Sequence, residues 1–218
     1  MVELHLILEG GGQPNAENAS IAYNTQVLRE SLHSFFKRLL CRDDVSIVVS
    51  MEFGYRNAVQ KFLKKDSFYL FVDLDAPKSE SQNWFIKLAT ENPNKPLYIP
   101  SSKQKDVYFM IQEMEAWFLK QPTCFEKWAK SEGWVRRHAS EKIEEYTPIM
   151  GKNIEEIVKP SITTANLLKH FFEKRIKEEK RKLAKYGKLA VAPALLDNLD
   201  VKMLELQDSE LHRFKISV

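Results

Sequence analysis

Cysteine is scarce in this chain of 218 residues, which contains only Cys41 and Cys124. The two lie far apart and form no CxxC pair, which argues against a disulfide framework or a structural zinc site and suits a reducing compartment. No apolar run approaches the roughly 20 residues of a membrane-spanning helix, and Glu3 stands where a signal peptide would be apolar. We therefore expect a cytoplasmic protein without a membrane partner.

Histidine and glycine are also scarce. The five histidines show no ligand spacing, so the sequence predicts neither a zinc site nor a histidine base; they are His5, His33, His138, His170 and His212. Three of only seven glycines are consecutive, at residues 10–12, where a backbone could approach a ligand closely. This loop is neither GxGxxG nor a Walker A motif, so it does not support nucleotide binding of either usual kind.

The charge is nearly balanced overall but uneven along the chain. Lys and Arg total 33 against 30 acidic residues, whereas residues 169–188 alone hold nine basic residues and three glutamates. One interpretation is a solvated helix face with i,i+4 pairs such as Glu173 with Lys177. The other is a surface that binds nucleic acid phosphates. The residues predicted for that role are Lys174, Lys177, Lys180, Arg181 and Lys182.

Hydrophobic periodicity changes along the chain. Residues 2–8, 45–49 and 68–72 read as strands, and residues 97–99 and 107–111 as two further candidates, with helical patterns between them. The sequence therefore predicts an α/β core over residues 1–125, with a mostly parallel sheet flanked by helices. Residues 126–218 are predicted to form a helical extension packed on this core, including a helix from about Thr163 through Leu183.

Acidic residues end two of the predicted strands. Glu9 follows the first strand, and Asp73 and Asp75 follow the strand over residues 68–72. Carboxyl ends of parallel strands meet at one edge of a sheet, where ligands bind, so these three carboxylates are expected to converge. Such an oxygen site suits Mg²⁺ or Mn²⁺, with Asp73 and Asp75 as ligands and Glu9 as a ligand or proton carrier. The competing interpretation is a set of ordinary helix caps and loop residues.

These residues carry a family resemblance. A strand ending in Glu-Gly, followed later by one ending in Asp-x-Asp, resembles the Toprim domain of topoisomerases, primases and Old-type nucleases. The strings EGGG, YLFVDLDAP, QEMEAWFL and AVAPALLDNLD are similar to a bacterial family described only as a domain of unknown function, related to RloB and abortive-infection Toprim proteins.

This resemblance implies a Toprim-like fold and metal-dependent cleavage of DNA or RNA, often in phage defence beside a partner ATPase of the ABC or AAA type. Glu9, Asp73 and Asp75 match its acidic motif, with Gly10 in support, and Gln112 and Glu115 match its second string. Fold alone does not fix the reaction. An interaction module of an ATPase complex is the alternative, and primase-like nucleotidyl transfer is a third.

Two further residues have alternative roles. Glu115 is predicted at a strand-to-helix turn, where it is either another metal ligand or an acid that favours a helix N-terminus. Arg56 follows Gly54 at another such junction, where its guanidinium either binds a phosphate or pairs with a carboxylate of the group formed by Glu9, Asp73 and Asp75.

Overall fold

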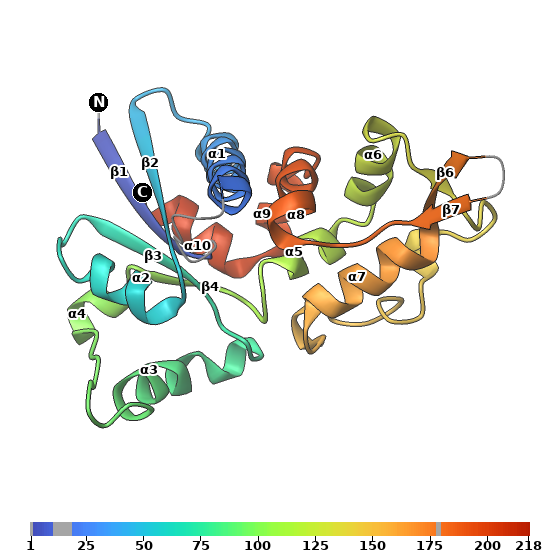
Figure 1. Cartoon of the computed structure of the whole chain (residues 1–218). Helices are drawn as coiled ribbons and strands as arrows, with labels where there is room; N and C mark the ends of the chain where they lie inside the picture. The colour runs from blue at the N-terminus through green and yellow to red at the C-terminus, as the bar shows by residue number, and fades with distance from the viewer. Residues whose placement is uncertain (1, 11–18, 178–179) are drawn as a thin grey trace.

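The core of the protein is a four-stranded parallel sheet (Figure 1). The computed structural model describes residues 2–10, 19–177 and 180–218. The strand order is β2-β1-β3-β4, and every neighbouring pair is parallel, which confirms the expected α/β fold. The strands are β1 (Val2–Glu9), β2 (Val45–Glu52), β3 (Phe68–Asp73) and β4 (Val107–Met110). Residues 97–99, a candidate strand in the sequence, do not form one.

Helices cover both faces of this sheet. Helix α1 (Ala19–Leu40) packs on one face, and α2 (Tyr55–Phe62) and α3 (Ser81–Thr90) pack on the other; α4 (Ser101–Gln104) precedes β4. Apolar residues of β3 point to both faces of the sheet: Phe71 faces the α1 side, whereas Leu70 and Val72 face the α2 side. No helix in the described part of the chain combines the length and apolar character that a membrane span requires.

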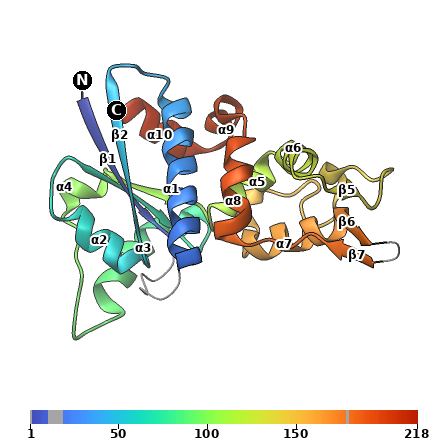
Figure 2. The ribbon, with the colours of Figure 1, turned by 45° about the horizontal axis from the view of Figure 1, so that its top comes forward.

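The C-terminal half adds a largely helical region that shares the core of the sheet. Helices α1 and α8 lie side by side (Figure 2). The Phe214 ring of α10 lies 5.0 Å from the Phe71 ring of β3, and Phe35 of α1 stacks on Trp117 at 5.1 Å. The helices are α5 (Glu115–Lys120), α6 (Thr123–Ser131), α7 (Pro160–Phe171), α8 (Lys188–Asp197), α9 (Val201–Gln207) and α10 (Ser209–Ser217).

The described residues between Phe172 and Leu183 form strands, so the prediction of a helix through Leu183 was wrong. Helix α7 ends at Phe171, and β6 (Phe172–Lys177) pairs antiparallel with β7 (Lys180–Leu183) and with the short β5 (Val135–Arg136). Buried Glu173 explains the difference, because its carboxylate pairs with Arg181 at 3.1 Å and with Arg137 at 3.5 Å, across the sheet and not along a helix. We call β6 and β7 the basic ribbon.

Candidate functional site

The candidate site lies where the strand order reverses. Strand β1 has β2 on one side and β3 on the other, and open parallel sheets bind ligands at the carboxyl ends of such a pair. Glu9 is the last residue of β1 and Asp73 the last residue of β3. The backbone N–H of Asp73 donates to Glu9 Oε2 at 3.3 Å, so the two acids that sequence reasoning placed at this edge are in contact.

Asp73 is held from two sides. Its Oδ1 accepts a hydrogen bond of 3.0 Å from the backbone N–H of Met114, just before α5. Its Oδ2 lies 3.1 Å from the Nζ of Lys188, the first residue of α8. A residue more than a hundred positions away in the chain thus supplies the cation for the Asp73 carboxylate.

Glu115 is the third acid of this group and, unlike the half-buried Glu9 and Asp73, is buried. It is the first residue of α5, is only 2% exposed, and its Oε1 accepts a 2.7 Å hydrogen bond from the Tyr186 hydroxyl. Burial raises the pKa of Glu115 and, more strongly, that of Tyr186, so the phenol remains a hydrogen-bond donor. We call Glu9, Asp73 and Glu115 the acidic cluster.

The electrostatics of the acidic cluster show a shortage of positive charge. Burial, and after it the charge of Asp73, raises the pKa of Glu9 to about 7, and burial also raises the pKa of Asp73. Burial alone would lower the pKa of Lys188, but the charges of Asp73, Glu115 and Glu9 outweigh it and the pKa is raised. Lys188 therefore stays protonated; its ammonium contacts Asp73 and also attracts the half-buried Glu9 and the buried Glu115.

Asp75 lies beside the acidic cluster but has other partners. Its Oδ1 is 2.6 Å from Lys159 Nζ, which also lies 3.3 Å from Glu113, and the Asp75 side chain is about half exposed. The Lys159 pKa is raised, first by its hydrogen bond to Asp75. The structure thus places Asp75 in an exposed ion-pair group next to the acidic cluster, and the convergence of all three predicted carboxylates on one point is not seen.

The backbone around these groups adopts unusual conformations. Asp75, Gln112 and Lys159 have φ values of 53°, 61° and 56°, in the left-handed region that non-glycine residues rarely occupy. The Asp75 N–H donates to the Gln112 carbonyl at 2.7 Å, and the Gln112 N–H donates to Ala76 at 3.2 Å. Such strained residues persist only where surrounding contacts hold them, and they often mark functional sites.

The two predicted supporting residues, Gly10 and Gln112, have structural roles at this edge. Gly10 has φ of 136°, and a Cβ there would lie 3.1 Å from Met51 Cε, so glycine is required. The Gln112 side chain is buried and donates from Nε2 to the Glu155 carbonyl at 3.2 Å. The remaining two glycines of the predicted loop, at positions 11 and 12, lie outside the described residues.

Arg56 has structural partners. Its Nη1 lies 2.6 Å from Glu91 Oε1 and 3.3 Å from the Leu88 carbonyl, and Nη2 donates to the Lys95 carbonyl. It therefore fastens the start of α2 to the end of α3, and the predicted pairing with a carboxylate of the acidic group was wrong, because the partner is Glu91. A phosphate contact by Arg56 stays a prediction.

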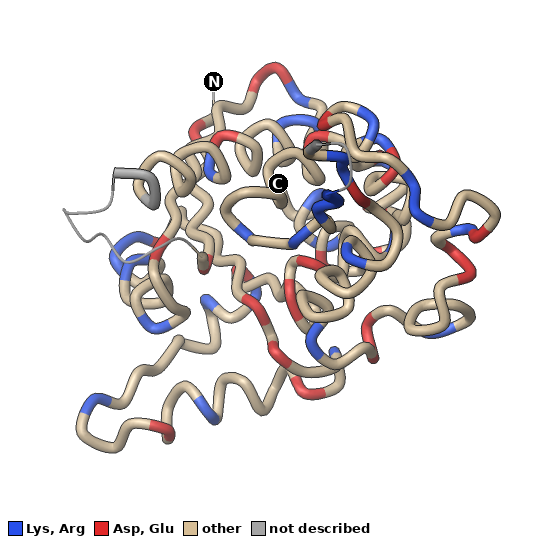
Figure 3. Tube along the Cα trace, turned by 45° about the vertical axis from the view of Figure 1, so that its right-hand side comes forward, with Lys and Arg blue, Asp and Glu red and all other residues tan. Residues whose placement is uncertain are grey.

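The basic ribbon concentrates positive charge, whereas both signs are interspersed over the rest of the chain (Figure 3). Its register places Lys174 opposite Lys182, Arg175 opposite Arg181 and Lys177 opposite Lys180. Like charges directly opposite each other destabilise a strand pair, so these cross-strand pairs do not stabilise the ribbon. Lys174 Nζ lies 4.6 Å from the centre of the Trp134 ring, and the Lys177 side chain lies outside the described part of the structure.

Sequence reasoning missed Lys188 and Tyr186 as members of the site. The sequence showed Lys188 only as the last residue of the basic range 169–188; the structure separates it from the ribbon and places it at the N-terminus of α8. A lysine there is unfavourable for the helix dipole, and this was a signal that a specific acidic partner holds it.

The comparisons with known proteins place the chain in a family. Residues 16–214 match the family model described as "Domain of unknown function (DUF4276)". Neither a curated protein nor a solved structure matches the chain. Since the matched region covers most of the sequence, this protein belongs to the DUF4276 family.

Proposed function

We propose that this protein is a divalent-metal-dependent nuclease that hydrolyses phosphodiester bonds of DNA or RNA. One observation carries the proposal: the half-buried Glu9 and Asp73 and the buried Glu115 gather near the reversal point of a parallel sheet, and the Lys188 ammonium, in contact with Asp73, offsets their charge. Structural carboxylates are normally matched by cations or exposed to water, whereas perturbed groups in such a position are typical of functional sites.

The donor set fits a hard divalent cation. Glu9, Asp73 and Glu115 offer only carboxylate oxygens, which suit Mg²⁺ or Mn²⁺. Asp75, half exposed and next to this group, is a further candidate ligand. The raised pKa values of Glu9 and Asp73 support the fit, because an added positive charge would relieve the repulsion that raises them. A bound ion would supply Lewis-acid polarisation of a phosphate group.

The protein's own residues would supply the rest of the chemistry. Glu9 would serve either as a ligand or as the proton carrier; the second role applies when Asp73 and Glu115 hold the ion, and the raised pKa of Glu9, about 7 without metal, suits it. The Lys188 ammonium is fixed on Asp73 and can also bind a phosphate oxygen. The hydrogen bond from Tyr186 orients Glu115.

The basic ribbon supports a nucleic acid substrate. It leads directly into the site, because β7 ends at Leu183 and the next residues include Tyr186 and Lys188 (Figure 1). Phosphates would neutralise the like-charged pairs of the ribbon, and Lys180 and Lys182 are exposed for that contact. The free thiols of Cys41 and Cys124 fit a reducing cytoplasm, and there we place the reaction, in phage defence with a partner ATPase.

Cleavage of plasmid, single-stranded DNA and total tRNA with Mg²⁺ or Mn²⁺ tests the proposal. We expect the wild type to cleave at least one of them, and the Glu9→Gln, Asp73→Asn double variant to lose at least about 10²-fold in rate. Glu52→Gln is the matched control, since Glu52 ends the neighbouring strand β2 but pairs with Lys61. It should cleave like the wild type.

The thermal stability of the same proteins with and without metal separates the alternatives. If neither cleavage nor a metal-dependent shift occurs, the proposal is contradicted and an interaction module of an ATPase complex is favoured. A shift in the wild type that the double variant lacks, without cleavage, would support the metal site and direct the search to the partner.

A charge-reversal experiment tests the ribbon. The Lys180→Glu, Lys182→Glu variant is expected to bind DNA or RNA about tenfold more weakly and to lower the salt slope of binding by about 2, because two phosphate contacts are lost. Arg181 is left in place because it neutralises buried Glu173. Lys64→Glu, Lys202→Glu, at exposed positions elsewhere, is the equally charged control. Equal binding by the two variants would show that the ribbon is only a solvated surface.

A further inference from the structure

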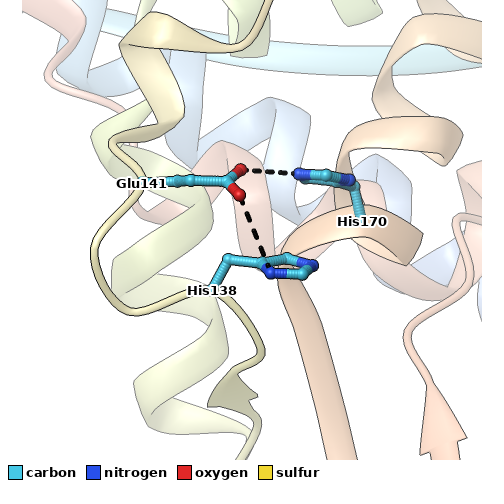
Figure 4. A group of neighbouring side chains, drawn as sticks. All are labelled: His138, Glu141 and His170. Atoms are coloured by element: carbon cyan, nitrogen blue, oxygen red, sulfur yellow. Dashed lines mark hydrogen bonds and ion pairs between the residues drawn. The ribbon is translucent and has the colours of Figure 1, made fainter.

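Two histidines and a glutamate meet at the end of α7, away from the acidic cluster (Figure 4). The Glu141 carboxylate bridges the edges of the two stacked imidazoles, with Oε2 2.8 Å from His170 Nε2 and Oε1 3.7 Å from His138 Nδ1. One ligand atom of each residue lies within 4.8 Å of the others. All three side chains are 36–50% exposed, so an ion can reach them from solution.

The backbone holds the two chain segments that carry these groups. His138 and Glu141 follow β5, and His170 is in the last turn of α7. Arg136 donates from Nη2 to the carbonyls of His138, at 3.3 Å, and Glu141. Arg137 donates from Nη1 to the carbonyl of His170 at 3.3 Å, and its backbone N–H donates to Phe171 at 2.8 Å. Two adjacent arginines thus fix both segments before any ion binds.

We propose that His138, Glu141 and His170 bind a divalent transition-metal ion, with Zn²⁺ as the best fit. Two imidazole nitrogens and one carboxylate oxygen form a three-ligand set that leaves a fourth tetrahedral position for water. Tetrahedral zinc ligands lie roughly 3.4 Å apart for Zn–N bonds of about 2.1 Å. The Glu141–His170 and Glu141–His138 distances of 2.8 and 3.7 Å bracket this value, and the two stacked imidazoles must turn so that a nitrogen of each faces the ion.

This site differs in chemistry from the acidic cluster. Imidazole ligands select zinc, cobalt or nickel, whereas the all-carboxylate cluster suits Mg²⁺ or Mn²⁺. An ion here would join the segment after β5 to α7, immediately before β6, which starts the basic ribbon. We therefore expect the ion to stabilise the start of the basic ribbon and to take no part in the chemistry of the acidic cluster. The competing explanation is a hydrogen-bonded trio that binds no ion.

Titration of the untagged, chelator-treated chain with Zn²⁺ and Co²⁺ distinguishes these explanations. In the Glu9→Gln, Asp73→Asn double variant, where the acidic cluster no longer competes for the ion, we expect one calorimetric Zn²⁺ site and, with Co²⁺, the intense visible absorption of tetrahedral coordination. His138→Ala and His170→Ala should each lower the affinity at least about tenfold, and Zn²⁺ should raise the melting temperature of the wild type but not of these variants. Glu141→Gln, at an exposed position, provides a third variant that keeps the shape of the side chain.

Two controls define the assignment. His33→Ala, at an exposed position on α1, should bind Zn²⁺ like the wild type. The Glu9→Gln, Asp73→Asn double variant should also retain this Zn²⁺ site, which separates the result from that of the proposed nuclease centre. The inference is overturned if the wild type binds no Zn²⁺, or if the His138 and His170 variants keep wild-type affinity and stoichiometry.

Discussion

Replacing Lys188 by methionine is expected to lower the free energy of unfolding by about 3 kcal/mol at pH 8. Methionine keeps the length of the side chain but removes the ammonium that lies 3.1 Å from Asp73 and attracts Glu115. Loss of one partner from a buried ion pair costs about 3–5 kcal/mol, because the other charge stays buried and uncompensated. The lower end applies because 31% of the Lys188 side chain remains exposed. Urea denaturation measures the change.

The pH dependence identifies the cause. Glu9 and Asp73 have raised folded-state pKa values, so each can be neutral in the folded state at a pH where it is ionised in the unfolded chain. The penalty in Lys188→Met should therefore be smaller at pH 5 than at pH 8, and Asp73→Asn in the same chain should restore part of the stability. Lys202→Met, at an exposed position on α9, is the control. A Lys188→Met variant as stable as the wild type at pH 8 would contradict this account.

The sheet and the contact between Glu9 and Asp73 could be predicted from local sequence patterns. Strand β3 is a short, wholly apolar run that ends in an acid, and β1 also ends in an acid. Parallel strands bring their carboxyl ends together, so the contact between Glu9 and Asp73 required only the fold class. The position of Asp75 could not be predicted in this way. Its left-handed backbone turns the chain toward Lys159, a residue whose position depends on the distant start of α7.

The partners of Glu173 and the contact between His138 and His170 depend on long-range packing. Glu173 and Lys177 have the spacing of a helical ion pair, but the partners of Glu173 are Arg137 and Arg181, which only strand pairing brings near. Similarly, His138 and His170 are 32 positions apart, and their contact exists because β5 pairs with β6 beside the end of α7. Sequence spacing detects neighbours within an element and not those that tertiary structure brings together.

Neutralising Glu9 is expected to have the opposite effect to neutralising Lys188. Glu9→Gln should raise the free energy of unfolding by about 3 kcal/mol at pH 8, because the wild-type protein must ionise a group whose pKa is about 7 when folded against a model value of 4.5. The folded state binds more protons than the unfolded chain between these two values, so wild-type stability falls as the pH rises through this range. The advantage of the variant should shrink to about 1 kcal/mol at pH 5.

The hydrogen bond from the Asp73 N–H can be kept by the glutamine oxygen, so the comparison isolates the charge. Glu3→Gln, an exposed position on the same strand, is the control and should stay within about 0.5 kcal/mol of the wild type at each pH. A divalent cation should stabilise the wild type more than Glu9→Gln, since the ion replaces repulsion with attraction only where the carboxylate is present. Equal stability of Glu9→Gln and the wild type from pH 5 to pH 8 would show that Glu9 ionises without a penalty, and that the acidic cluster already has enough positive charge.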